Sequence, residues 1–227
     1  MPVSPVEKSS YTIGVDVGKV RDPAALCVLE RRSVFQPGPH HPAHPEHGRE
    51  AVSYRIRHLE RLPLATTYPA VAERVAIVAE RLRASLHAHT ATLADVVVDV
   101  TGVGRPVFDL LADRGLAAQL VGVNFTGGLK ANTSDGRIWN VPKRDLVAGL
   151  VVMFQARELR IAEQLADASV LVNELVNFRM TLSEAGRDSY GNGGDAEHDD
   201  YVTAAALCAW RARLRAPREL GRGGRLV

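Results

Sequence analysis

Acidic residues stand at the ends of apolar segments in three separate parts of the chain. Asp16 follows the segment YTIGV, Asp99 ends the run VVVD, and the pair Asp199 and Asp200 opens an Ala-rich stretch. Functional sites of α/β sheets form beyond the carboxyl ends of the strands. If the strands of Asp16 and Asp99 are neighbours, their carboxylates converge at one edge, where Asp199 and Asp200 could complete a cluster.

Such a cluster has a definite chemistry. Converging carboxylates repel one another, so their proximity is costly unless a cation lies between them. Hard oxygen ligands suit Mg²⁺ or Mn²⁺. Two such ions, about 3.5–4 Å apart, would activate a water molecule and stabilise the leaving oxygen during phosphodiester hydrolysis. The acidic residues therefore predict metal binding and phosphoryl chemistry.

Each acidic residue also has a purely structural interpretation. An Asp at a helix start is most often an N-cap or a partner of the helix dipole, and for Asp199 alone this role is favoured roughly two to one. Asp99 could cap the helix after TGVG in the same way. Asp16 fits poorly, because it follows an apolar strand and precedes a glycine turn. Taken together, the three positions favour the metal-site hypothesis.

The hydrophobic period predicts the elements that must position these residues. Strands are expected at residues 11–16, 24–32, 51–62, 95–100, 120–124 and 178–182. Helices are expected at residues 68–89, within 101–115, and at 142–157, 168–177 and 200–214, with loops at 125–140 and 186–200. This order predicts one α/β domain whose mixed central sheet combines an antiparallel meander with parallel strands, covered by helices on both faces.

The composition excludes several classes of protein. The 227 residues are 46% hydrophobic and carry 28 Lys and Arg against 26 Asp and Glu, a net charge of +2. These values exclude wholesale disorder, a collagen-like fibre, a coiled coil and a strongly basic nucleic-acid coat. Cys27 and Cys208 are expected to be buried thiols in a reducing compartment.

No targeting or membrane segment is predicted. The N-terminus lacks the apolar core of a signal peptide, and no run approaches the roughly 20 apolar residues of a membrane helix. We therefore expect a soluble, cytoplasmic protein. Residues 1–10 are expected to be an N-terminal extension, residues 11–215 the folded domain, and residues 216–227 a flexible Arg- and Gly-rich tail.

Basic residues near the acidic segments could hold DNA phosphates. Lys143 and Arg144 begin a predicted helix, and Lys130 and Arg137 lie in the polar loop before it. A basic loop can grip a nucleic-acid backbone, and an aromatic side chain can stack on a base. The first pair is also consistent with a solvated helix start, and Trp139 with packing beneath the loop. The His- and Pro-rich residues 36–48 are more consistent with a loop than with a metal site.

The acidic segments resemble the nuclease domain of phage large terminase subunits. The matching segments are GVDVGKVRDPAALCVLE, VVVDVTGVGRPVFDLL, VPKRDLV and EHDDYVTAAAL. Each alone is weakly specific, but their order, spacing and predicted context are fairly specific together. The resemblance covers most of the chain, from about residue 13 to residue 212.

The resemblance implies an RNase H-like fold of the RuvC type. It also implies metal-dependent endonucleolytic cutting of concatemeric double-stranded DNA at genome packaging. The residues it assigns to two divalent ions, Mg²⁺ or Mn²⁺, are Asp16, Asp99 and Asp200, flanked by Asp199, His198 and Asp22. The sequence does not choose between Asp199 and Asp200 as the third ligand. The Gly-rich residues 186–197 could form a hairpin that gates DNA entry, as such an element does in the family.

One feature of large terminases is missing. They carry an ATPase domain ahead of the nuclease, whereas this sequence has no G-x-x-x-x-G-K-[ST] motif. We therefore expect an excised nuclease domain or a stand-alone relative that acts on double-stranded DNA. An ATPase motor domain, a portal protein or a small terminase protein could be its partner, in the cytoplasm of a host cell.

Two other functions stay open on the sequence. A junction-resolving nuclease of the RuvC kind shares the fold. A non-catalytic DNA-binding or packaging-motor docking module would use the acidic residues only as helix caps.

Overall fold

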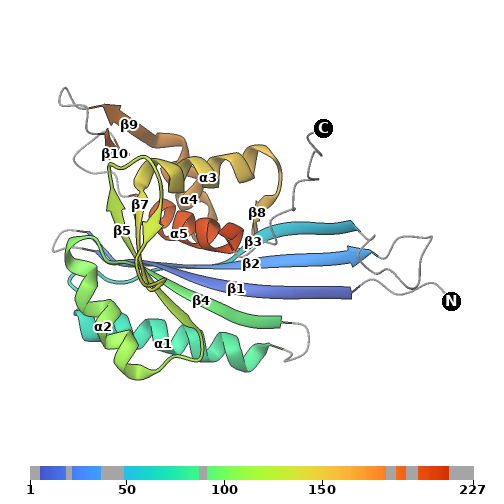
Figure 1. Ribbon diagram of the computed structural model, residues 1–227, viewed down its shortest axis with the longest axis horizontal. Helices are drawn as coiled ribbons and strands as arrows, with labels where there is room; N and C mark the ends of the chain where they lie inside the picture. The colour runs from blue at the N-terminus through green and yellow to red at the C-terminus, as the bar shows by residue number, and fades with distance from the viewer. Residues whose placement is uncertain are drawn as a thin grey trace, which may run out of the picture.

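A mixed sheet of eight strands, in the order β6-β7-β5-β4-β1-β2-β3-β8, forms the centre of the protein (Figure 1). The computed structural model describes residues 6–18, 22–36, 49–86, 91–182, 188–192 and 199–214. The strands of the sheet are β1 (Val6–Asp16), β2 (Ala25–Gln36), β3 (Arg49–Arg61), β4 (Ala91–Asp99), β5 (Gln119–Thr126), β6 (Asn132–Thr133), β7 (Ile138–Pro142) and β8 (Leu159–Ile161). The helices are α1 (Tyr68–Ser85), η2 (Gly102–Gly104, a 3₁₀ turn), α2 (Arg105–Arg114), α3 (Lys143–Gln155), α4 (Ala168–Asn177) and α5 (Asp200–Leu214).

The predicted combination of an antiparallel meander and a parallel section is confirmed. Strands β1, β2 and β3 pair antiparallel. Strands β1, β4, β5 and β7 are successive parallel neighbours. The strands that end in Asp16 and Asp99 are therefore adjacent and run in the same direction.

Helices cover both faces of the sheet, and the strand residues alternate between two cores. Ile13, Val15 and Val98 lie in the core beneath α1 and α2. Val97 and Cys27 lie in the core beneath α3, α4 and α5. Figure 1 shows the two groups of helices on opposite sides of the sheet. Burial on both faces explains why these strands are continuously apolar.

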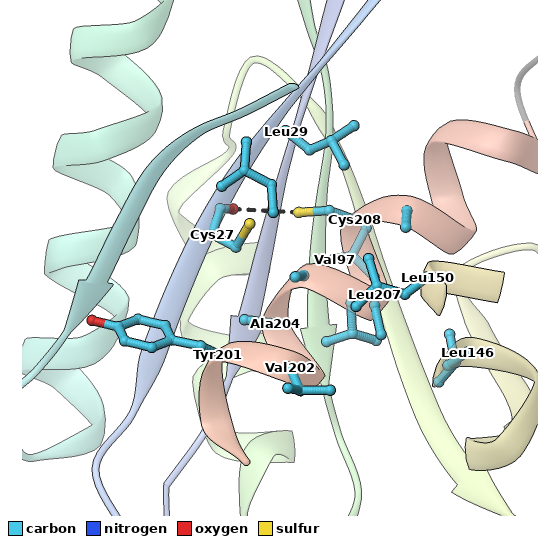
Figure 2. Packing of buried hydrophobic residues seen from close by; sticks show 14 of the residues in the cluster. Cys27, Leu29, Val97, Leu146, Leu150, Tyr201, Val202, Ala204, Leu207 and Cys208 are labelled. Atoms are coloured by element: carbon cyan, nitrogen blue, oxygen red, sulfur yellow. Dashed lines mark hydrogen bonds between the residues drawn. The ribbon is translucent and has the colours of Figure 1, made fainter. Parts of the chain in front are cut away.

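Helix α5 packs directly on β1 and β2, because small residues face the sheet. A Cβ atom at Gly14 would lie only 2.1 Å from the carbonyl oxygen of Ala204. The thiol of Cys208 donates to the carbonyl oxygens of Cys27, at 3.3 Å, and Thr12, at 3.4 Å. Figure 2 shows this thiol pointing from α5 toward Cys27. Both cysteines are buried, as the sequence predicts. Helix α5 begins close to the end of β1, since Asp16 and Asp200 line one pocket.

Some predicted boundaries are wrong, because strand pairing extends beyond the local apolar pattern. Strand β1 begins at residue 6 rather than 11, since Val6 pairs with Phe35 of β2. Strand β4 begins at Ala91 rather than residue 95, since Ala91 pairs with Ser9. In both extensions the backbone forms hydrogen bonds with the neighbouring strand, and polar residues form such bonds as readily as apolar ones.

Two segments predicted as loops contain strands. Residues 138–142 form β7, which pairs with β5, and its Val141 is buried in the core. The helix α3 consequently begins at Lys143 rather than at Pro142. Strand β10 (Asp188–Asn192) lies in the predicted loop 186–200 and pairs antiparallel with β9 (Phe178–Leu182). A strand at the position of β9 is predicted from the sequence. In both cases the partner strand supplies the backbone hydrogen bonds.

Several sequence predictions fall wholly or partly outside the described residues. They concern the greater part of the His- and Pro-rich segment 36–48, residues 186–187 and 193–197 of the segment considered for gating, His198 and the tail 216–227. Among the helices that the structure describes, none combines the length and the hydropathy needed to cross a membrane.

Candidate active site

A pocket with a volume of about 380 Å³ lies at the carboxyl ends of β1 and β4. Five predicted acidic residues line it: Asp16, Asp22, Asp99, Asp199 and Asp200. The period of the strands explains the convergence. Gly14 and Val97 lie on the α5 face of the sheet. Successive side chains of a strand alternate between faces, so Asp16 and Asp99, each two residues further on, lie on that same face. The predicted convergence of the acidic residues is therefore confirmed.

The glycine-rich turn after Asp99 fixes this carboxylate. The backbone N–H of Thr101 donates to Asp99 Oδ1 at 2.7 Å, and the Thr101 hydroxyl accepts from the N–H of Phe125 at 2.8 Å. Gly102 has a φ of +70°, and a Cβ atom at Gly104 would lie 1.7 Å from the carbonyl oxygen of Asp99. The two glycines let the turn pass directly beside Asp99. Gly104 is the N-cap residue of α2, so Asp99 does not have the capping role considered above.

A carboxylate from another helix caps α5. Glu174 Oε2, on α4, accepts from the backbone N–H groups of Tyr201 at 3.0 Å and Val202 at 3.2 Å. An N-cap side chain ordinarily accepts from these positions of the first turn. Glu174 takes that role, and the Asp199 carboxylate instead binds Lys143 Nζ at 3.1 Å. The side chain of Asp199 therefore does not cap α5, whereas its position at the start of the helix stays consistent with a partner of the helix dipole.

Two cations of the chain hold the acidic pair. Lys143 contacts Asp199, and its ammonium lies 5.7 Å from the centre of the Phe125 ring. Arg61 Nε lies 3.5 Å from Asp200 Oδ2, and the same guanidinium makes a short ion pair with Glu174. These contacts partly neutralise the negative charge at the start of α5.

Burial and like charges make the ionised form of Asp16 unfavourable. Its pKa is raised well above the ordinary value by burial, and further by the charges of Asp99 and Asp200. Lys143 offsets part of this effect. The pKa of Glu174 is also raised, to about 6, because burial outweighs its contacts with the α5 backbone and Arg61.

The donor chemistry of the pocket fits a divalent cation. Within the described ranges, no three His, Cys, Asp or Glu side chains form a ready-made metal cluster. The pocket nevertheless supplies carboxylate oxygens, the ligands that Mg²⁺ and Ca²⁺ prefer. A cation there would offset both the burial and the repulsion that raise the pKa of Asp16. The pocket residues therefore fit a metal ion. In this structure Lys143 and Arg61 instead pair with Asp199 and Asp200.

The predicted DNA-binding residues do not all lie at this pocket. Lys143 lines it, and its neighbour Arg144 donates to the carbonyl oxygen of Gly128 at 3.4 Å. Lys130 is exposed in the loop that follows β5, on the carboxyl edge of the parallel strands. Arg137 precedes β7 and therefore lies toward the opposite edge, with its guanidinium 5.9 Å from the Phe108 ring.

Trp139 is a packing residue rather than an exposed stacking platform. Its ring lies edge-on to Trp210 of α5, with 5.5 Å between the centroids. Its indole N–H donates to the carbonyl oxygen of Gly136 at 3.2 Å. The structural interpretation of this residue is thus confirmed.

Sequence reasoning missed Arg61 and Glu174. Arg61 reads as the polar end of a half-exposed strand and carries no local signal. Glu174 does carry one: it lies three residues after Leu171 and one before Leu175, on the buried side of α4. A single acid on the apolar face of a helix requires a polar partner in the tertiary structure.

Solved structures share this arrangement of elements. The large terminase nuclease from thermophilic phage G20c with bound magnesium has a TM-score of 0.54 and 21% identity, over 89% of this chain and 82% of that one. The chain has the fold of a large terminase nuclease. The human cytomegalovirus terminase nuclease domain has a TM-score of 0.53 and 13% identity, over 90% and 84% of the two chains. The nuclease domain of the Thermus phage P74-26 large terminase has a TM-score of 0.51 and 22% identity, over 88% and 78%.

The likeness to terminase nucleases confirms the predicted RNase H-like, mixed α/β fold. It is a likeness of structure, because the sequence matches no protein-family model and no curated protein.

Proposed function

We propose that the protein is a metal-dependent endonuclease that cuts double-stranded DNA during the packaging of a viral genome. The observation that carries this proposal is the pocket in which Asp16, Asp99, Asp199 and Asp200 meet at the carboxyl ends of parallel strands. The terminase nuclease fold supports it, because the solved structures with that fold are nucleases by description.

The proposed ligands are those that the resemblance implies, and their place in one pocket supports them. Asp16, Asp99 and Asp200 would hold two divalent ions, Mg²⁺ or Mn²⁺, with Asp199 and Asp22 beside them. Such ions supply an activated water molecule and stabilise the leaving oxygen when they are bound. The magnesium in the G20c nuclease supports this choice of metal. His198, which precedes the pair, remains a candidate from the sequence.

The protein's own groups would hold the DNA backbone. Lys143 projects into the pocket, so its ammonium can pair with the phosphate next to the scissile bond when it leaves Asp199. Lys130 and Arg144 lie beyond the same edge and would contact neighbouring phosphates. Arg137, at the opposite edge, would have to contact a different stretch of DNA. Phosphate contacts carry no sequence information, so we expect cutting with little sequence preference.

The biological setting is part of the proposal. Double-stranded DNA would be the substrate, in the cytoplasm of the host cell. A separate or attached ATPase motor domain would move the DNA, and a portal or small terminase protein would place the nuclease at the cut. Strand β10 lies within residues 186–197, the segment considered for gating DNA entry, and it pairs with β9, which lies before that segment.

Plasmid digestion tests the activity. Supercoiled DNA incubated with Mn²⁺ or Mg²⁺ should be nicked and linearised, and EDTA should stop the reaction. Asp16→Asn and Asp99→Asn should each reduce the rate at least about 10³-fold, since each removes a charge from a metal ligand. Asp109→Asn is the matched control, because Asp109 is exposed on α2, where it pairs with Arg105.

Three outcomes would contradict the proposal. Full activity of Asp16→Asn and Asp99→Asn would remove the assigned site. Strong preference for four-way junctions over linear DNA would favour a junction-resolving nuclease. DNA binding without cutting at any metal concentration would favour a docking module.

A further inference from the structure

We propose that Glu174 and Arg61 are positioning residues that set the places of Asp199 and Asp200 in the active site. This inference rests on the proposed nuclease function. Neither residue lines the pocket, and both act through the first turn of α5.

The first argument concerns the backbone of α5. The initial N–H groups of a helix have no partner within the helix, and the N-cap side chain is their usual acceptor. Here Glu174 accepts from both Tyr201 and Val202. If Glu174 were absent, the best-placed acceptor would be the carboxylate of Asp199, the residue directly before the helix. By capping α5 from outside, Glu174 leaves Asp199 available to the pocket.

The second argument concerns Arg61, which connects three groups. Its guanidinium pairs with Glu174 and Asp200 and lies 4.5 Å from the centre of the Tyr201 ring. It therefore joins the capping carboxylate to a proposed metal ligand. An arginine fork suits this role, because its geometry is planar and its charge is permanent.

The third argument concerns the sheet register. Asp16 pairs with Ala25, and Ala25 pairs with Arg61, so the three residues form one row across β1, β2 and β3. Side chains of such a row point to the same face, and two strand spacings separate Asp16 from Arg61 by roughly 10 Å. Arg61 thus ties Asp200 to the row of the sheet that carries Asp16.

The hydroxyl of Tyr201 gives the same turn another anchor. It donates to the carboxylate of Asp167, the residue that precedes α4. Tyr201 and Glu174 are buried, so these polar groups are held in a low-dielectric interior where an unpaired group is costly. The first turn of α5 is therefore attached both to α4 and to the sheet.

Metal affinity is the property that this positioning should control. Residues that orient metal ligands typically change metal affinity 10- to 100-fold when they are mutated. We expect Glu174→Ala to raise the Mn²⁺ concentration for half-maximal plasmid cutting by about 10- to 100-fold. Glu174→Gln, whose amide oxygen can still accept from the helix, should show a smaller increase. Arg61→Met should also show an increase, because it releases Asp200.

The control acts on the other end of the same helix. Arg211 Nε donates to the buried Asp95 Oδ1 at 2.9 Å, so Asp95→Asn weakens the attachment of the C-terminal end of α5. This variant should have a lower melting temperature and an unchanged Mn²⁺ requirement. A merely structural role of Glu174 would make the two variants alike.

Two measurements separate the possible failures. Cutting is measured against Mn²⁺ concentration, and Mn²⁺ binding to the DNA-free protein is measured by calorimetry. An active parent protein whose Glu174→Ala and Glu174→Gln variants keep the parental Mn²⁺ affinity would overturn the positioning role alone. An equal shift in Asp95→Asn would also overturn it. A folded parent protein that neither cuts DNA nor binds Mn²⁺ would overturn the proposed function, and the positioning role with it. Glu174→Gln keeps the test available if Glu174→Ala does not fold.

Discussion

At the scale of single residues, the pocket and its surroundings contain several carboxyl groups. Burial disfavours the ionised form of two of them, Asp16 and Glu174. The pKa of Asp16 is raised because the desolvation of this half-buried carboxyl group disfavours its charge, and because Asp99 and Asp200 add like charges. Burial also raises the pKa of Glu174, although Arg61 and a backbone N–H favour its charged form. The two residues differ in the group that can stabilise their charged form. A metal ion would stabilise charged Asp16, whereas Arg61 already contacts Glu174.

Glu174 predicts a fall in stability as the pH rises. Its pKa is raised from 4.5 to about 6, so the unfolded chain loses this proton at a lower pH than the folded protein. Its favourable contribution is complete below pH 4.5 and is lost as the pH rises through 6. The loss is about 2 kcal/mol, at about 1.4 kcal/mol per pKa unit.

Urea unfolding between pH 4 and pH 7 checks this dependence. The free energy of unfolding of the parent protein, minus that of Glu174→Gln, should fall by about 2 kcal/mol across this range. A difference that stays constant with pH would contradict the raised pKa.

At the scale of elements, α5 closes the site because its small residues allow it to approach the sheet. Ala204 and its neighbours are buried against β1 and β2, and Gly14 leaves room for the helix backbone. A larger residue at either position would move the whole helix, with Asp199 and Asp200 at its start. The Ala-rich composition of α5 therefore serves the site as well as the core.

Gly14→Ala tests this close packing. The added Cβ atom would lie 2.1 Å from a backbone oxygen of α5 and 2.8 Å from Cys208 Sγ, so the helix must shift. We expect a loss of at least about 3 kcal/mol in the free energy of unfolding, at the upper end of overpacking costs. Denaturant titration gives the value. Gly127→Ala, where an added Cβ atom meets nothing within 4 Å, should change stability by less than about 0.5 kcal/mol. Equal effects of the two substitutions would contradict the packing argument.

At the scale of the whole molecule, the net charge of +2 conceals a local separation of charge. Five aspartates line one pocket, while Lys143, Arg144 and Lys130 lie at the same edge of the sheet. Near-neutrality therefore does not argue against DNA binding. It reflects acidic groups at the centre of the site and basic groups around it.

Metal binding should stabilise the whole molecule. A cation that binds only the folded state at 100 times its Kd adds about 2.7 kcal/mol. For a domain of this size that corresponds to a rise of roughly 5–10 °C in Tm. Differential scanning fluorimetry with Mn²⁺ should show this rise in the parent protein and lose most of it in Asp16→Asn. A rise of equal size in that variant would place the bound ion elsewhere.

Local pattern was sufficient for many elements and for part of the site. The run VVVD predicted a buried strand ending in Asp99, and YTIGVD did the same for Asp16. Helices α4 and α5 follow the predicted ranges closely. Strands β7 and β10 could not be predicted in this way, because β5 and β9 supply their hydrogen bonds.

The sequence by itself determined the acidic residues, the alternation of strands and helices, and the resemblance that implied the fold. Each depends on neighbouring residues or on short, ordered motifs. Only the tertiary structure decided that Glu174 caps α5, that Asp199 turns to Lys143, and that Trp139 packs against Trp210. Arg61 and Glu174 are 113 residues apart in the chain, so no local pattern could reveal their contact. A buried charge requires a partner, and for Glu174 on α4 that partner is Arg61 at the end of β3, which only the folded chain places beside it.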